Sequence, residues 1–165
     1  MNQQDYTITV SVDRTPAEVF DAINDVRGWW SQDVDGDTDV VGAEFRYRGR
    51  DDAGTRQHRA TIRVTDLVPG EKVVWRVLEN HMNFIEDQSE WKDTEIRFEL
   101  VGAGGGTEIR FTHAGLVPAY ECFDVCSDAW GFFIRDSLWR LITTGQGSPI
   151  ARADAVRARG QANVG

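Results

Sequence analysis

Five segments in which apolar and polar residues alternate, followed by one segment with a helical period, constrain the fold of this chain most strongly. The five segments lie between residues 44 and 114, and a sixth lies at residues 6–13. Alternation with a period of two predicts strands with one buried and one solvated face. After Pro118 the apolar residues recur at helical spacing as far as Gly145. We therefore predict an α+β fold in which a curved, six-stranded antiparallel sheet wraps around one long helix at residues 118–144.

Two short helices are expected directly after the first strand. Thr15 has the position of an N-cap, Pro16 that of the first helical residue, and Glu18 completes a capping box. A second helix is expected at residues 27–31. The helix pair should close one end of the space between sheet and long helix.

The length and composition indicate one domain. The chain has 165 residues, of which 41% are hydrophobic, so a packed core is available. We expect the domain to cover residues 1–147. Residues 148–165 are rich in Ala, Arg and Gly and contain no aromatic residue, which favours a flexible C-terminal tail.

The charge balance excludes two classes of partner. With 18 basic and 27 acidic residues the net charge is −9, which argues against nucleic acid and against a membrane surface, since both are bound through basic patches. No apolar run reaches 18 residues. The two cysteines and the absence of a recognisable secretory signal favour a cytoplasmic location.

Several short motifs occur in an order that is informative as a set. They are TPAEVF at residues 15–20, WW at 29–30, EW at 90–91, THAGL at 112–116 and WGFF at 130–133. With these motifs the chain resembles, over about residues 5–149, the START-like (SRPBCC) superfamily, and within it the branch named after the activator of the heat-shock chaperone's ATPase. The resemblance implies a helix-grip fold. It also implies a range of functions, because the superfamily includes lipid carriers, cyclases, hydrolases and chaperone partners.

The inward-facing residues are rich in aromatic side chains, which either pack as a core or line a ligand cavity. His58 and His113 share the inward parity of their strands, and with Tyr47 they could orient a ligand. No nucleophile–base pair is recognisable, so no catalytic residue is assigned. The candidate ligand-binding residues are Trp30, Phe45, Tyr47, His58, Trp75, Phe98, Phe111, His113, Trp130 and Phe133.

Two patterns that could suggest a metal are better explained otherwise. Cys122 and Cys126 lie one helical turn apart, but this is not a usual zinc spacing, and small apolar core residues are the better reading. The acidic stretch at residues 33–44 has the spacing of a calcium loop, yet Thr38 stands where that loop needs Gly. We expect a solvated acidic loop there, and neither a metal nor a cofactor in the protein.

The connection at residues 79–93 is long for a compact domain. It predicts either a flap over a pocket or an extended hairpin. Our leading hypothesis is a protein that binds a small, largely apolar or aromatic molecule between the sheet and the C-terminal helix. The alternatives are a co-regulator of a chaperone ATPase that acts through its surface, and a cyclase- or hydrolase-like enzyme.

Overall fold

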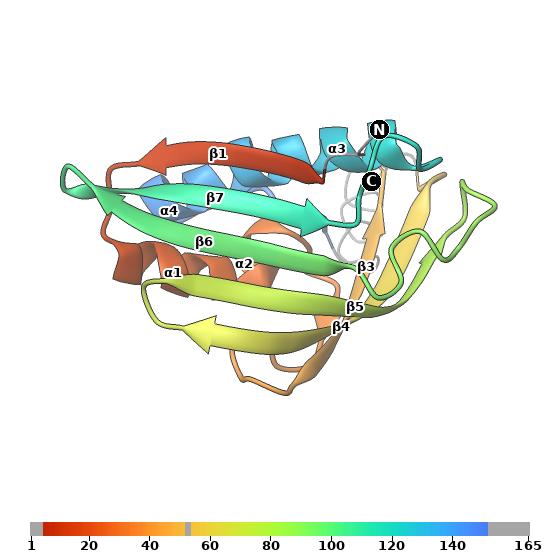
Figure 1. Ribbon diagram of the computed structural model, residues 1–165, viewed down its shortest axis with the longest axis horizontal. Helices are drawn as coiled ribbons and strands as arrows, with labels where there is room; N and C mark the ends of the chain where they lie inside the picture. The colour runs from red at the N-terminus through yellow and green to blue at the C-terminus, as the bar shows by residue number, and fades with distance from the viewer. Residues whose placement is uncertain (1–4, 52–53, 152–165) are drawn as a thin grey trace, which may run out of the picture.

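The fold is one seven-stranded antiparallel sheet with all helices on one side, behind the sheet in the view of Figure 1. The computed structural model describes residues 5–51 and 54–151. The strand order is β1-β7-β6-β5-β4-β3-β2. The elements are β1 Tyr6–Val12, α1 Pro16–Asn24, α2 Val26–Trp29, β2 Val34–Asp35, β3 Glu44–Arg50, β4 Gln57–Val68, β5 Lys72–Met82, β6 Glu95–Ala103, β7 Gly106–Ala114, α3 Phe123–Phe132, the π-helix η1 Phe133–Leu138, and α4 Trp139–Thr144.

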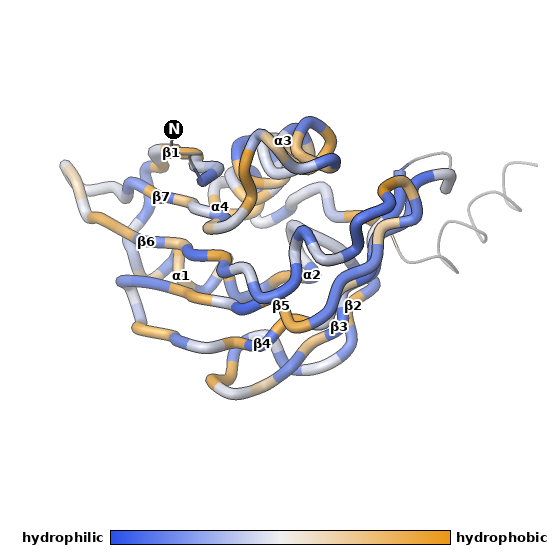
Figure 2. The backbone as a smooth tube through the Cα atoms, turned by 45° about the vertical axis from the view of Figure 1, so that its right-hand side comes forward, coloured by the Kyte–Doolittle hydropathy of each residue, from blue (hydrophilic) through white to orange (hydrophobic). Residues whose placement is uncertain are grey.

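The predicted alternation of buried and exposed residues is present in the sheet, and Figure 2 shows the hydropathy changing repeatedly along the strands. Phe98 of β6 pairs with Phe111 of β7, and both are fully buried. The pairing of β4 with β5 shifts register twice, at Thr61/Ile62 and at Val64/Asp66. Such irregularities bend and twist a strand pair, which allows this half of the sheet to curve around the helices.

The expected count of six strands is too low by one. The two-residue strand β2, Val34–Asp35, pairs with β3 at the edge of the sheet, within the stretch that the sequence suggested to be a solvated loop. The carboxylates of Asp33 and Asp35 form ion pairs with arginines of β3. Asp33 and Asp35 therefore hold the edge strand β2 against β3. Their charge alone does not indicate this role.

The long C-terminal helix exists, but it begins at Phe123 and not at residue 118. It continues without a break through the π-helical turn η1 to Thr144, and Gly145 ends it in the left-handed conformation at φ 84°. Residues 118–122 form turns instead. The backbone N–H groups of Glu121 and Cys122 donate to the distant Glu90 carboxylate, at 2.7 and 3.1 Å, which caps the start of the helix from outside it.

The two predicted short helices are present. Thr15 and Glu18 form the expected capping box of α1. The second helix, α2, lies slightly earlier than predicted, at Val26–Trp29, and buries Trp29 completely. The indole Nε1 of Trp29 donates to the carbonyl of Ile23, which ties α2 to α1.

The C-terminal segment predicted as a tail is described only as far as Ala151, and residues 152–165 lie outside the described residues. Within the described part, Ile150 forms a parallel bridge with Ser31. Its amide donates to the carbonyl of Trp30, and its carbonyl accepts from the amide of Gln32. The segment 148–151 thus lies against the loop that follows α2.

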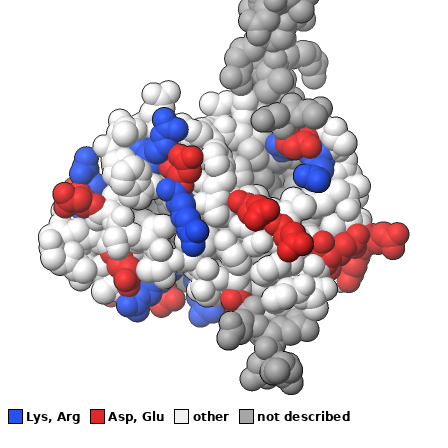
Figure 3. Space-filling model, turned by 90° about the horizontal axis from the view of Figure 1, so that it is seen from above, with Lys and Arg blue, Asp and Glu red and all other residues white. Residues whose placement is uncertain are grey.

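None of the helices in the described part of the chain combines the length and the apolar character that a membrane span requires. On the face seen in Figure 3, the described Lys and Arg side chains are interspersed with Asp and Glu side chains and form no continuous basic patch.

Ser137 in the π-helical turn generates a testable prediction for stability. Its buried hydroxyl donates to the carbonyl of Trp29 at 2.6 Å and accepts from the amide of Ser148 at 2.7 Å. Ser137→Ala leaves both backbone groups without this partner and should lower the free energy of unfolding by about 1–3 kcal/mol, measured by urea denaturation. The control Ser127→Ala removes only a bond to a carbonyl of its own helix and should change stability by less than about 0.5 kcal/mol. Equal effects of the two substitutions would contradict the assignment.

Candidate functional site

A pocket with a volume of about 500 Å³ lies between the ends of β3 and β4, the segment after β5, helix α3, and residues 148–150. Its size is that of a site for a small organic molecule. Its lining residues are Trp30, Tyr47, Gly49, Arg50, Asp51, Arg56, His58, Met82, Phe84, Trp91, Val125, Cys126, Ala129, Trp130, Phe132, Phe133, Ser148, Pro149 and Ile150.

Four buried aromatic rings form the floor of the pocket. Trp30 stacks on Tyr47 with 3.9 Å between the ring centroids, and its ring lies 5.0 Å from that of Trp130. Trp130 stacks in turn on Trp91 at 5.9 Å. Gly49 lies beside Tyr47, and a Cβ atom at this position would collide with the Tyr47 hydroxyl. Stacked rings lose little conformational entropy when they contact a ligand, so this floor is a preorganised apolar surface.

The structure brings together five of the ten residues predicted from the sequence. Trp30, Tyr47, His58, Trp130 and Phe133 line the pocket. The other five, Phe45, Trp75, Phe98, Phe111 and His113, are fully buried and are not part of its lining. The four phenyl and indole rings among them are in mutual contact, as the centroid distances of 5.1 Å for Trp75–Phe98 and 5.2 Å for Phe98–Phe111 show. The hollow expected beneath the middle of the helix is thus filled by rings, and the open space lies at one end.

His113 is at the centre of a chain of hydrogen bonds beneath the floor. The indole N–H of Trp130 donates to Nδ1 of His113 at 3.1 Å, so this nitrogen is unprotonated. Nε2 therefore carries the proton and donates to the Thr94 hydroxyl at 2.8 Å. That hydroxyl donates to the carbonyl of Trp91 at 2.5 Å. Burial, with a smaller effect of nearby His58, lowers the pKa of His113 to about 3.

His58 lies at the pocket on the other side of Trp91. The ring of Trp91 meets both histidines edge-on, with 4.6 Å between centroids in each case. Nε2 of His58 lies 2.5 Å from Oδ1 of Asn80. Burial lowers the pKa of His58 to about 4, although the bond to Asn80 opposes this shift. Both imidazoles are therefore neutral at pH 7.

The segment at residues 79–93 is partly a hairpin extension and partly a flap at the pocket, which are the two forms expected from the sequence. Its first residues continue β5 to Met82, which pairs with His58. The remainder packs inward, with Ile85 and Trp91 buried and Phe84 in the pocket lining. The Gln88 side chain bonds the backbone of Met82 and Ile85 and holds this turn. Trp91 is not among the ten ligand-binding residues predicted from the sequence, because its place in the floor depends on this turn.

Sulfur atoms form one wall of the pocket. Met82 and Cys126 both line it, and their sulfur atoms are 4.0 Å apart. A hydrogen bond with Cys122, together with burial, raises the pKa of the Cys126 thiol. Both cysteines are free and buried. Among the described residues no group of three or more His, Cys, Asp or Glu side chains could hold a metal ion. These thiols act as apolar wall and core atoms.

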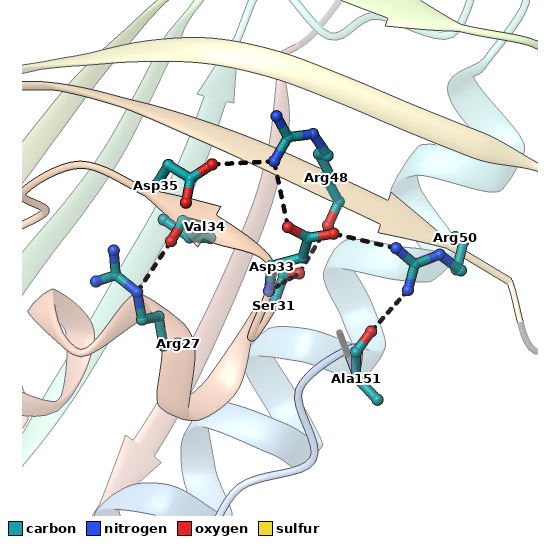
Figure 4. Close-up of polar contacts among 8 residues, drawn as sticks. All are labelled: Arg27, Ser31, Asp33, Val34, Asp35, Arg48, Arg50 and Ala151. Atoms are coloured by element: carbon teal, nitrogen blue, oxygen red, sulfur yellow. Dashed lines mark hydrogen bonds and ion pairs between the residues drawn. The ribbon is translucent and has the colours of Figure 1, made fainter. Parts of the chain in front are cut away.

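Arginines at the pocket mouth are the functional candidates that the sequence analysis missed. Figure 4 shows Asp33 between Arg48 and Arg50, with Arg50 also reaching the carbonyl of Ala151. Arg50 has the outward parity of Arg48, so alternation hides it, but it is the last residue of β3 and reaches the rim. Arg56 precedes His58 by two residues. Because it has the same inward parity as His58, Arg56 could have been expected at the pocket from the sequence.

Comparison with known proteins shows the family to which the chain belongs. The sequence model of the family described as "Activator of Hsp90 ATPase homolog 1-like protein" matches residues 13–143, which is most of the chain. The chain belongs to this family. The resemblance inferred from the motifs is thereby confirmed, as is the helix-grip fold.

Solved structures similar to this family member share its fold. The Aha1 dimer from Colwellia psychrerythraea is 24% identical with a TM-score of 0.66, and the match covers 87% of this chain and 99% of that one. Protein CV1439 from Chromobacterium violaceum is 16% identical, with a TM-score of 0.64 and coverage of 84% and 96%. CalU16 from Micromonospora echinospora is 16% identical, with a TM-score of 0.60 and coverage of 97% and 85%. No curated protein matches the sequence.

The neutral histidines of this family member predict how its stability depends on pH. The folded protein keeps His113 and His58 neutral down to about pH 3 and 4, whereas the unfolded chain binds these protons below about pH 6.5. Stability is therefore fully present above pH 6.5 and decreases as the pH falls toward 4, by up to about 1.4 kcal/mol per pH unit for each histidine. Urea denaturation between pH 7.5 and 5 measures the slope, and His58→Gln should reduce it by about half. A flat profile would disprove the buried neutral pair.

Proposed function

We propose that this chain is a cytosolic protein that binds a small, largely apolar or aromatic molecule in the pocket between the sheet and α3. The observation that carries the proposal is the floor of stacked rings, Trp30, Tyr47, Trp91 and Trp130, at the base of a 500 Å³ space. Burial of apolar ligand surface on such a floor contributes about 25 cal/mol per Å² before the costs of association. The two free, buried cysteines are in keeping with a reducing compartment.

The polar groups at the pocket suit orientation of a ligand better than chemistry. Both ring nitrogens of His113 are occupied by Trp130 and Thr94, so this histidine is not free to move a proton. Burial raises the pKa of the Tyr47 hydroxyl, which stays protonated and can donate a hydrogen bond. A cyclase- or hydrolase-like reaction therefore has less support than binding.

A co-regulator of a chaperone ATPase is the second candidate, and the observation that favours it is the family match itself. Such a protein would act through its surface and would not need the pocket. The two candidates differ in one respect that an experiment can address, namely whether filling the pocket abolishes activity.

Ala129→Phe tests the binding proposal. Ala129 lies at the pocket on an exposed position of α3, so a phenyl group there should fill the space without disturbing the core. The neutral probe 2-naphthamide should quench tryptophan fluorescence of the wild type and stabilise it by about 2.7 kcal/mol at a hundredfold excess over Kd. The Ala129→Phe variant should bind 2-naphthamide at least about tenfold more weakly than the wild type does.

Ala17→Phe is the matched control, because Ala17 is exposed on α1 and is not part of the pocket lining. It should bind like the wild type. If neither 2-naphthamide nor a panel of flavones and fatty acids quenches or stabilises the wild type, the binding proposal fails. Stimulation of an Hsp90 ATPase that Ala129→Phe leaves intact would then favour the second candidate.

A further inference from the structure

The lining of the pocket differs in charge from the chain as a whole. The chain as a whole has a net charge of −9. The pocket lining, however, contains two guanidinium groups, of Arg50 and Arg56, and one carboxylate, of Asp51. Asp33, which lies outside the lining, pairs with Arg50. The cation without an ion-pair partner among the described residues at the pocket is therefore Arg56, and a neutral apolar ligand does not require such a group.

Arg50 is held in a fixed position at this mouth. One of its terminal nitrogens donates to the Asp33 carboxylate at 3.1 Å, and the other donates to the carbonyl of Ala151 at 2.7 Å. Its side chain is only 19% exposed. Asp33 also accepts from Arg48 at 3.2 Å, and Arg48 pairs with Asp35. Two carboxylates thus balance two guanidinium groups, which fixes Arg50 without making the mouth negative (Figure 4).

Arg56 differs from Arg50 because it has no ion-pair partner among the described residues. Its backbone amide donates to Oδ1 of Asp51 at 3.1 Å, and this bond shapes the bend before β4. The bond uses the backbone of Arg56 and leaves its guanidinium group available. A guanidinium group presents five donors in a planar fork that matches the geometry of a carboxylate.

We propose that the ligand of this pocket is an aromatic acid, whose ring lies on the Trp30–Tyr47–Trp91–Trp130 floor and whose carboxylate binds the Arg56 guanidinium group beside Arg50. This inference rests on the proposed function and adds the chemical class of the ligand. The ring supplies apolar contact, and the carboxylate supplies orientation at the mouth. A charge-assisted hydrogen bond there distinguishes an acid from its neutral isostere.

Three probes that share one ring system test the charge preference. They are 2-naphthoate, 2-naphthamide and 2-naphthyltrimethylammonium, titrated at pH 7.5 with tryptophan quenching as the readout. We expect 2-naphthoate to bind about tenfold more tightly than the amide in 20 mM salt, and the ammonium compound to bind most weakly. The preference for the acid should diminish in 300 mM salt, because the mouth is solvent-accessible.

Variants of the arginine assign that preference to a residue. Arg56→Gln should bring the ratio of the two affinities below about threefold by weakening 2-naphthoate binding more than 2-naphthamide binding. Arg56→Lys, which keeps the charge but not the planar fork, should keep part of the preference. Arg59→Gln is the matched control, since Arg59 is an exposed arginine of β4 outside the pocket lining. Its affinity ratio should equal that of the wild type.

The outcomes separate the two proposals. If all three probes fail to bind, this inference is overturned, and if the flavones and fatty acids also fail, the proposed function itself is wrong. If the amide binds as tightly as the acid, or the ammonium compound binds most tightly, the pocket is a site for aromatic molecules but not for acids, and this inference is overturned. A preference for the acid that survives in Arg56→Gln would overturn the role given to Arg56.

Discussion

The chain of hydrogen bonds that runs from the Trp130 indole through His113 and Thr94 to the carbonyl of Trp91 is the interaction on which the pocket depends. It joins helix α3, strand β7 and the turn after β5, three parts of the chain that are far apart in sequence. These hydrogen bonds require a neutral His113, because its Nδ1 must accept from Trp130 while its Nε2 donates to Thr94. Because both tryptophans belong to the pocket floor, the same bonds that hold the helix on the sheet also fix the surface that a ligand would contact.

The position of the pocket follows from how the remaining space is filled. A helix laid across a curved sheet leaves a hollow, and here Trp75, Phe98 and Phe111 fill it beneath the middle of the helix. Near the ends of β3 and β4 the inward positions are occupied by Gly49 and by the half-buried His58, which fill less space. The hollow persists at that end, and residues 148–150 and the turn after β5 form its walls. The guanidinium groups of the mouth lie where the strands stop, since a charged side chain there can reach both ligand and water.

The fold could be predicted from the sequence to a large extent, because alternation and helical spacing are local properties. Phe98 and Phe111 could be assigned to the inner face from their parity alone. Parity does not show whether an inward ring lines a cavity or fills it, since that depends on ring volumes contributed by several strands and a helix. The helix start was placed five residues too early because its cap, Glu90, lies about 30 residues away. The edge strand β2 could not be predicted, because it is stabilised by ion pairs between Asp33 and the arginines of β3, which are distant in sequence.

The central claim is that the aromatic floor is a binding surface, and the indole N–H signals of ¹⁵N-labelled protein test it most directly. The chain has six tryptophans. Trp30, Trp91 and Trp130 lie at the pocket, whereas Trp139 is half-exposed on α4 and donates to the carbonyl of Ser11 in β1. On titration with 2-naphthamide, the account predicts that the signals of Trp30, Trp91 and Trp130 shift together along one binding curve while that of Trp139 stays in place. A spectrum in which none of the three moves, or in which only Trp139 responds, would contradict it.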